Sequence, residues 1–341
     1  MRSIVTAIIL LSGILMHAAS PGLRASISEI IGNNRVGVAV ITSRGDTISV
    51  GNEGYFDLAS VMKFYQAAAL SRVCDFDTLV RKQIRVTAKD LRRDTWSPMR
   101  AAADEVPFDI SPVGLLDYSL NMSDNNAADI LFDRLLAPAK VDSIVRNDYG
   151  AQKFAIGATE AMMHADTSTS RLNRATALDA AEFIYRFFTA DTTASATLVK
   201  AVMAKDTPFG RQRIPSGIET SSAKVFHKTG TGFTAPDSTV TPVNDLAFIS
   251  YPTARGFACY SLAVFTAGMT VADAEALIAE ISRVVYTSVI VDESLVMNSE
   301  AQVYAGKRKP GKTTSNEDDG GILGAVISEV LFEIIDSALS D

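Results

Sequence analysis

The chain has 341 residues, of which 47% are hydrophobic and 21% are charged, and its formal net charge is −7. An acidic balance without a basic cluster argues against nucleic acid binding, which needs Lys and Arg gathered on one face. The three histidines, His17, His164 and His227, lack the spacing of a zinc site, so we expect neither a metal nor a cofactor. Cys74 and Cys259 could pair or stay separate, and the sequence leaves both possibilities open.

The first twenty residues have the pattern of a secretory signal peptide. Arg2 is the positive start, an apolar run covers residues 4–15, and small residues occupy positions 18–20. The run is shorter than the roughly 20 apolar residues of a transmembrane helix, and no later stretch reaches that length. We therefore expect a soluble mature protein that is secreted into the periplasm, with cleavage somewhere between about residues 19 and 25.

The next part of the chain predicts a short helix, a hairpin and then a long helical section. The helix covers residues 26–31, and two β-rich runs at 36–43 and 46–50 are joined by a turn containing Gly45. From Ser60 to about residue 204, Ala and Leu recur at helical spacing.

Strand patterns then return. They cover residues 223–231, 246–251 and 260–266, and an amphipathic helix over 271–285 follows them. Two early and three late strands predict one five-stranded antiparallel sheet flanked by helices. The fold class is α/β (α+β) with an inserted all-α subdomain. Clefts between lobes favour binding, so the seam between sheet and helices is the expected site.

The predicted organisation has three parts: a signal peptide at 1–20, a domain at 21–289 and a tail at 290–341. Within the domain, residues 21–59 and 205–289 form the sheet lobe and 60–204 the helical lobe. In the tail, the polar stretch 305–321 is typical of a linker. Residues 322–339 form an apolar stripe opposite acidic residues, which predicts an amphipathic helix that docks on its own domain or on another chain.

Three short motifs point to nucleophilic catalysis. Ser60 and Lys63 form an S-x-x-K sequence, and a helix would place the lysine amine beside the serine hydroxyl, which needs such a base. Alone this pattern is weak, because residues 221–224 fit it too. S-D-N at 123–125 and K-T-G at 228–230 follow in order, and the set is far more specific than any member.

In motif order and spacing the chain resembles class A serine β-lactamases from about residue 26 to residue 289, which implies the fold of serine β-lactamases and penicillin-binding proteins. H-K-T-G-T at 227–231 is similar to the family's extended strand motif, and W-S-P at 96–98 to its aromatic segment before the S-D-N loop. T-E-A-M-M-H at 159–164 resembles the omega loop of an extended-spectrum subgroup. There a histidine, His164 here, replaces the asparagine that helps to hold the hydrolytic water in most members.

The resemblance implies a catalytic role for four residues. Ser60 would attack the lactam carbonyl, Lys63 would accept or relay its proton, and Ser123 would pass a proton to the departing nitrogen. Glu160 would activate the water that releases the acyl group. The backbone N–H groups of Ser60 and Thr231 would form the oxyanion hole.

The resemblance also implies a set of substrate contacts. Lys228, Thr229 and Thr231 would hold the substrate carboxylate, Asn125 would bind the side-chain amide, and Asp124 would brace its loop. The implied substrate-binding residues are Asn125, Lys228, Thr229, Gly230, Thr231, Trp96 and His164.

Each feature has a plainer alternative. Residues 123–125 could cap a helix and 228–230 could be a strand that enters a turn. Glu160 could be a surface carboxylate and Trp96 a core residue. Arg213 could be the carboxylate-binding arginine of some members, although its spacing differs by one residue, or a solvated surface arginine.

The predicted function is hydrolysis of penicillins and cephalosporins, and hence antibiotic resistance, by a serine acyl-enzyme. One rival is a penicillin-binding D-alanyl-D-alanine peptidase, which lacks an omega-loop glutamate, so Glu160 discriminates between them. A second rival is a non-catalytic protein of the same fold, against which intact Ser60, Lys63, Ser123 and Lys228 argue. The preferred β-lactams stay open.

Overall fold

The computed structural model describes residues 20–207, 209–218, 222–253 and 256–305. At its centre lies one five-stranded antiparallel sheet with the strand order β2-β1-β10-β9-β8, which confirms the predicted fold class. The strands are β1 (Arg35–Thr42), β2 (Thr47–Gly51), β8 (Lys224–Thr234), β9 (Val240–Thr253) and β10 (Gly256–Ala267). β8 is an edge strand, so one of its sides is free of strand partners.

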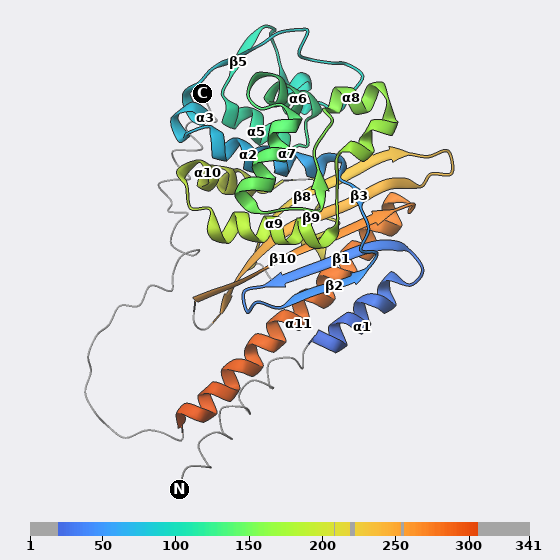
Figure 1. Ribbon diagram of the computed structural model, residues 1–341, viewed down its shortest axis with the longest axis vertical. Coiled ribbons are helices and arrows are strands. Elements are labelled where there is room, and N and C mark those ends of the chain that lie inside the picture. The colour runs from blue at the N-terminus through green and yellow to red at the C-terminus, as the bar shows by residue number, and fades with distance from the viewer. Residues whose placement is uncertain (1–19, 208, 219–221, 254–255, 306–341) are drawn as a thin grey trace, which may run out of the picture.

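Helices cover both faces of the sheet (Figure 1). The α-helices of the described residues are α1 (Ser20–Ile31), α2 (Met62–Val73), α3 (Phe76–Arg81), α4 (Pro98–Ala102), α5 (Pro112–Asn121), α6 (Asn125–Arg134), α7 (Pro138–Tyr149), α8 (Glu160–Ala165), α9 (Ala177–Ala190), α10 (Ala194–Met203) and α11 (Val271–Ala305). An Asp, Ser or Thr side chain accepts a hydrogen bond from the first turn of α3 to α6 and α8 to α10. These caps fix where each helix begins.

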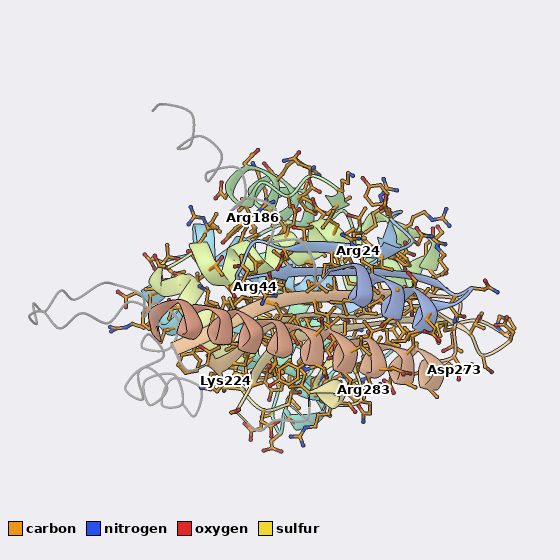
Figure 2. All side chains as sticks on the ribbon, turned by 90° about the horizontal axis from the view of Figure 1, so that it is seen from below. Arg24, Arg44, Arg186, Lys224, Asp273 and Arg283 are labelled. Atoms are coloured by element: carbon orange, nitrogen blue, oxygen red, sulfur yellow. The ribbon has the colours of Figure 1, made fainter. Side chains whose placement is uncertain are left out.

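The sheet separates two hydrophobic cores, one on each of its faces. β1 is buried on both faces, because Val38 and Val40 belong to one core, and Ala39 and Ile41 to the other. α1 and α11 close the first core; Figure 2 shows them side by side on the outer face. α9 and the remaining helices close the second core.

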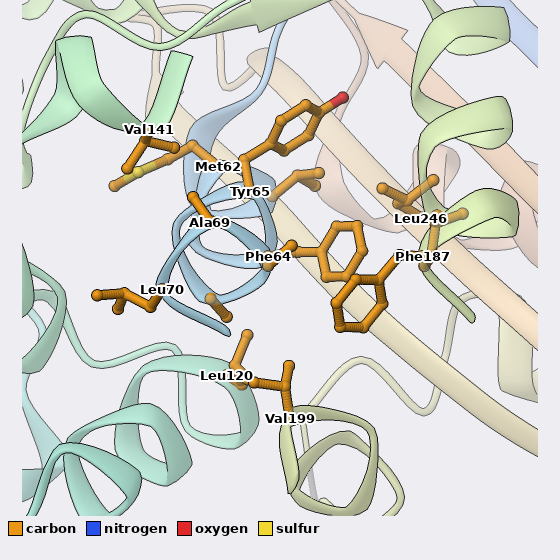
Figure 3. Packing of buried hydrophobic residues seen from close by; sticks show 14 of the residues in the cluster. Met62, Phe64, Tyr65, Ala69, Leu70, Leu120, Val141, Phe187, Val199 and Leu246 are labelled. Atoms are coloured by element: carbon orange, nitrogen blue, oxygen red, sulfur yellow. The ribbon is translucent and has the colours of Figure 1, made fainter. Parts of the chain in front are cut away.

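α2 runs through the middle of the second core. Every residue from Met62 to Ser71 is buried, as expected for a helix surrounded by other elements. Figure 3 shows Phe64 directed toward Phe187, and the two ring centroids are 5.4 Å apart. Leu120 and Val199 pack below the helix in the same view. The start of α2 is therefore held rigidly.

The helical section is not all α. Residues 84–86 (β4) and 108–110 (β5) form a two-stranded sheet. A second small sheet has the order β3-β7-β6; its strands are Phe56–Asp57 (β3), Phe154–Ala155 (β6) and Arg174–Ala175 (β7). Strands this short are too brief to show the two-residue alternation that identifies a strand in a sequence.

Both terminal helices are longer than predicted. α1 begins at Ser20 rather than residue 26, and α11 continues to Ala305, well past the expected end at residue 285. No Gly or Pro occurs from residue 269 to residue 305, so nothing in the local sequence stops the helix. The first sixteen residues of the predicted tail are thus helical. Residues 1–19 and the helix predicted over 322–339 lie outside the described residues.

Across the part of the chain that the structure describes, no helix combines the length and apolar character needed to cross a membrane. No disulfide joins Cys74 and Cys259, although the sequence leaves that pairing possible.

Candidate active site

Ser60 lies just before the N-terminal end of the buried helix α2. It belongs to a short 3-10 helix, η1 (Ala59–Val61), that runs directly into α2. Ala59 has φ 45°, a conformation that costs a non-glycine residue energy and that tends to occur at functional sites. The hydroxyl therefore lies at the N-terminal end of a helix, where the helix dipole favours negative charge.

Lys63 is fully buried and its amine contacts four oxygen atoms. Nζ lies 3.1 Å from Ser60 Oγ, 2.8 Å from the carbonyl oxygen of Ser123, and 2.6 Å from Asn125 Oδ1. It also lies 3.0 Å from Glu160 Oε1. An ammonium group has only three protons, so these four oxygens compete for them. The amine is placed to exchange a proton with either Ser60 or Glu160.

Ser123 joins the two lysines of the site. Its carbonyl oxygen accepts from Lys63, while its hydroxyl accepts a 3.0 Å hydrogen bond from Lys228 Nζ. Ser123 has φ 54°, which turns the loop between α5 and α6 toward both amines. Burial lowers the pKa of Lys228 well below its usual range, and the positive charges of Lys63 and Arg213 lower it further.

Asp124 holds this loop in place. It is fully buried and caps α6, with its carboxylate accepting from the backbone N–H of Ala127 at 2.8 Å. The same carboxylate accepts from Ser97 Oγ and from the backbone N–H of Met99. The cap predicted as a plain alternative for 123–125 is therefore present, and it coexists with the contacts of Ser123 and Asn125 to the lysines.

Glu160 is the first residue of α8 and is only 7% exposed, so the surface alternative is wrong. Its Oε1 faces Lys63 but receives no aligned hydrogen bond in the described part of the chain, and can accept one more proton donor. Asp129 of α6 accepts from the backbone N–H groups of Glu160 and Ala161 at 2.7 and 2.8 Å. Burial, together with the charge of Glu160, raises the pKa of Asp129 to about 7.

Strand β8 forms the opposite wall. Lys228 and Gly230 point inward, and a Cβ on Gly230 would stand 2.4 Å from the carbonyl oxygen of Leu58. Only glycine lets the strand approach the Ser60 turn so closely. The backbone of β8 therefore runs alongside η1, which is the arrangement expected for the Ser60 and Thr231 oxyanion hole.

The guanidinium of Arg213 contacts this wall at Gly230 and Thr231. Arg213 is 4% exposed, so the surface alternative is wrong. Nη2 donates to Thr231 Oγ1 at 2.7 Å, and Nη1 donates to the carbonyl oxygens of Gly230 and Asn244. Glu275 of α11 lies 3.3 Å from its Nε. A buried positive charge thus adjoins Thr231, which suits recognition of a carboxylate.

Aromatic side chains form the rim. Trp96 is 55% exposed, which contradicts the core alternative, and its ring lies 5.8 Å edge-on from Phe209. On the other side His164 packs edge-on against Phe233 of β8 at 5.6 Å. His164 Nε2 also lies 2.9 Å from Thr95 Oγ1, and Thr95 accepts from Asn125 Nδ2 at 2.7 Å.

The structure brings all the predicted site residues to one seam, and it adds Thr95 and Asp129. Neither carries a signal in the sequence, because Thr95 adjoins the W-S-P segment without belonging to it and Asp129 lies in a plain amphipathic helix. Among the described residues, no group of three His, Cys, Asp or Glu side chains could hold a metal ion.

Comparison with known proteins shows which family the chain matches. The model of the β-lactamase enzyme family matches residues 22–289. A β-lactamase from Phocaeicola vulgatus is 31% identical over 277 residues, covering 78% of this chain and 84% of that protein. The extended-spectrum β-lactamase PER-1 from Pseudomonas aeruginosa is 28% identical, with 84% of this chain and 96% of PER-1 covered.

Solved structures show the same likeness. The crystal structure of the TLA-1 extended-spectrum β-lactamase superimposes with a TM-score of 0.73 at 25% identity, over 80% of this chain and all of TLA-1. A class A β-lactamase from Bacteroides cellulosilyticus gives a TM-score of 0.73 at 27% identity, over 80% of this chain and 98% of that one.

Proposed function

The chain belongs to the β-lactamase enzyme family, and from this premise we propose that it hydrolyses penicillins and cephalosporins through an acyl-enzyme on Ser60. One observation carries the proposal: the Lys63 amine lies 3.1 Å from Ser60 Oγ and 3.0 Å from Glu160 Oε1. A single buried amine thus adjoins both the nucleophile and a carboxylate, so one proton relay serves formation and release of the acyl group.

Acylation begins with attack of Ser60 Oγ on the lactam carbonyl carbon. The serine proton passes to the Lys63 amine, either directly or after that amine has given a proton to Glu160. The oxyanion is stabilised by the backbone N–H groups of Ser60 and Thr231. As the C–N bond breaks, the Ser123 hydroxyl donates its proton to the departing nitrogen and regains one from Lys228, whose amine lies 3.0 Å away. The proton that Lys63 took from Ser60 is passed on through Ser123 to restore Lys228, so the net transfer is from Ser60 to the nitrogen, and any proton held by Glu160 returns to Lys63.

Deacylation requires a water activated beside the ester. Glu160 Oε1 is buried, faces Lys63 and keeps lone pairs for a water proton. The water oxygen attacks the ester carbonyl, its proton passes to Glu160, and the Ser60 oxygen regains a proton through Lys63. Asn125, Lys228, Thr229 and Thr231 hold the substrate, and Arg213 adds positive charge beside its carboxylate.

The test is the fate of the acyl-enzyme in Glu160→Gln. This variant should acylate with benzylpenicillin and accumulate the adduct, whereas the wild type returns to free enzyme within a turnover. Intact-mass spectrometry follows the adduct, and kcat should fall by about 10²–10⁴. Ser60→Ala is the control and should form no adduct. A wild type that itself stalls as a stable adduct, with Glu160→Gln unchanged, would instead favour the penicillin-binding peptidase.

Membership of the extended-spectrum subgroup is part of the same proposal. It is supported by His164 on α8, four residues after Glu160, and by the likeness to PER-1 and TLA-1, both called extended-spectrum enzymes. We expect turnover of cephalosporins with bulky side chains, measured as kcat/KM against benzylpenicillin. Values for such cephalosporins below a thousandth of that for benzylpenicillin would contradict the assignment.

Export to the periplasm is proposed from the first twenty residues. α1 limits where the signal can be cut, because Leu23 and Ile27 are buried in the core beside α11. Cleavage at residue 25 would remove Leu23 and about 2 kcal/mol of buried apolar contact. We therefore expect cleavage before Leu23. N-terminal sequencing of the periplasmic fraction checks this, and a mature chain starting later, or found only in the cytoplasm, would contradict it.

A further inference from the structure

Thr95 lies between two residues of the site and contacts both. Its Oγ1 accepts a 2.7 Å hydrogen bond from Asn125 Nδ2 and lies 2.9 Å from His164 Nε2. Asn125 in turn accepts from Lys63 Nζ at 2.6 Å. A continuous chain of hydrogen bonds therefore runs from the catalytic amine, through the Asn125 amide and the Thr95 hydroxyl, to a histidine on α8.

Donor and acceptor requirements set the direction of this chain. The Lys63 amine is a donor, so the oxygen of the Asn125 amide must face it and the NH₂ group must face away. Thr95 then accepts with a lone pair, and its own proton is available for the His164 ring nitrogen. One N–H of Asn125 is used by Thr95, and the second is left to bind an acceptor on the substrate.

The loop that carries Thr95 is anchored on both sides. Asn126, fully buried in α6, accepts from the backbone N–H of Arg92 and donates to its carbonyl oxygen. On the other side, the carbonyl oxygen of Trp96 accepts from the backbone N–H of Asn125, and the Trp96 indole donates to Met122. Thr95 is thus held at a fixed distance from Asn125 rather than on a free loop.

The chain closes into a ring through α8. Glu160 and His164 are four residues apart on this helix, so they lie on one face one turn apart. Glu160 contacts Lys63, and His164 contacts Thr95 and packs against Phe233. The Thr95 hydroxyl is the link in this ring between the loop that binds substrate and the helix that carries the proposed deacylation base.

We propose that Thr95 is a positioning residue that fixes the orientation of the Asn125 amide while the Thr95 hydroxyl is hydrogen-bonded to His164. Thr95 thereby determines the preference of the enzyme for β-lactams that carry an acylamino side chain. The inference rests on the proposed function, because Asn125 is taken to bind the substrate amide. Without the hydroxyl, one Asn125 N–H lacks an acceptor and the amide loses its fixed plane. A substrate without an acyl carbonyl makes no hydrogen bond to this amide, so its binding does not depend on how the amide is oriented.

The test compares Thr95→Val with Thr95→Ser on two penicillins. Benzylpenicillin has an acylamino side chain and 6-aminopenicillanic acid has only an amine. Thr95→Val should lower kcat/KM for benzylpenicillin on the order of tenfold, mainly through KM, the loss expected for one hydrogen bond. It should change kcat/KM for 6-aminopenicillanic acid less than about threefold. Thr95→Ser keeps the hydroxyl and should restore the wild-type preference.

The His164 contact is tested by a double-mutant cycle. His164→Leu should shift the preference between the two penicillins in the same direction as Thr95→Val, and the double variant should add little to either, because both remove one connected chain. Thr193→Val is the matched control, since the Thr193 hydroxyl caps α10 outside the site. It should lower the Tm and leave the preference unchanged.

The outcomes separate the two proposals. Equal losses on both penicillins in Thr95→Val, failure of Thr95→Ser to restore the preference, or additive effects in the cycle would overturn the role of Thr95 while wild-type turnover upheld the proposed function. A wild type that turned over neither penicillin would overturn both. If Thr95→Val failed to fold, Thr95→Ala compared with Thr95→Ser would supply the same contrast.

Discussion

At the scale of single residues, the site brings several ionisable side chains close together in a buried space. The amines of Lys63 and Lys228 both contact Ser123, and Arg213 lies behind Thr231. Glu160 provides the negative charge that faces Lys63. Burial and the neighbouring positive charges lower the pKa of Lys228 well below its usual range, so binding of an anionic substrate would favour its charged form.

Asp129 should make stability depend on pH. Its folded pKa is raised to about 7 from the ordinary value of 3.8, so the folded state holds this proton more tightly than the unfolded state. The contribution of Asp129 to stability is therefore greatest below about pH 4 and is lost as the pH rises to about 7. Asp129→Asn cannot ionise and should lack this loss, which we expect to be about 4 kcal/mol across that window.

Urea unfolding of both proteins from pH 4 to pH 8 measures the difference. Asn also loses one of the two acceptors for the α8 backbone, which adds a constant destabilisation at every pH. The decisive quantity is thus the slope, against pH, of the difference in the free energy of unfolding between the wild type and Asp129→Asn. Parallel curves would mean that Asp129 does not titrate in this range.

The motif residues of the site could be predicted, whereas their supports could not. Ser60 and Lys63 are found by local spacing on one helix, and Ser123 and Lys228 by their order along the chain. Thr95 and Asp129 act through hydrogen bonds to residues more than 25 positions away, and such long-range pairs leave no periodic trace in the sequence. The buried state of Arg213 was equally hidden, because it depends on Glu275 of a distant helix.

At the scale of elements, the decisive contact is between strand β8 and the 3-10 helix η1. Gly230 has room for no side chain, since a Cβ would stand 2.4 Å from Leu58 O and 3.2 Å from the backbone nitrogen of Val61. Gly230→Ala should therefore push β8 away from Ser60 and separate the two proposed oxyanion donors. We expect kcat/KM to fall by about 10²–10³ and stability by about 1–3 kcal/mol.

Gly22→Ala is the matched control for that change. Gly22 lies in α1 with nothing within 4 Å of an added Cβ, so in a mature chain that begins before Gly22 alanine there should stabilise the helix by up to about 1 kcal/mol. Its hydrolysis should equal that of the wild type. Steady-state kinetics and Tm for the two variants make the comparison, and a Gly230→Ala enzyme with wild-type kcat/KM would contradict the role given to this contact.

Elements were predictable where they were long. All five strands of the main sheet were found, because buried β-branched runs bounded by turns are a strong local signal. The two- and three-residue strands β3 to β7 have no signal in the sequence, since tertiary pairing rather than local sequence creates them. The sequence predicts an end of α11 that is too early, because Val and Ile near residue 290 weaken the helical pattern without breaking it.

At the scale of the whole molecule, one sheet supports two cores and the site lies where β8 meets the second. α11 belongs to the first core, yet it reaches the site through Glu275, and its Ser282 hydroxyl donates to the carbonyl oxygen of Ile214 beside Arg213. A Cβ on Gly217 would stand 2.3 Å from the carbonyl oxygen of Ala279, so the loop after Arg213 is pressed onto this helix. The outer helix thus supports the wall that we propose to hold the substrate carboxylate.

This coupling decides how the chain can be shortened. The described contacts of α11 with the first core end at Val289 and Ile290, while the helix continues to Ala305. A chain ending at Ala305 keeps every such contact and should retain the wild-type kcat/KM. It lacks the apolar stripe predicted over 322–339, so its Tm or its oligomeric state, measured by light scattering, should change.

A chain ending at Ala279 loses Ser282, Val285 and Val289 from the core and should fail to fold, because three buried groups contribute several kcal/mol. Loss of hydrolysis in a folded chain ending at Ala305 would show that the tail takes part in catalysis, and an unchanged Tm and oligomeric state would show that the predicted helix docks nowhere.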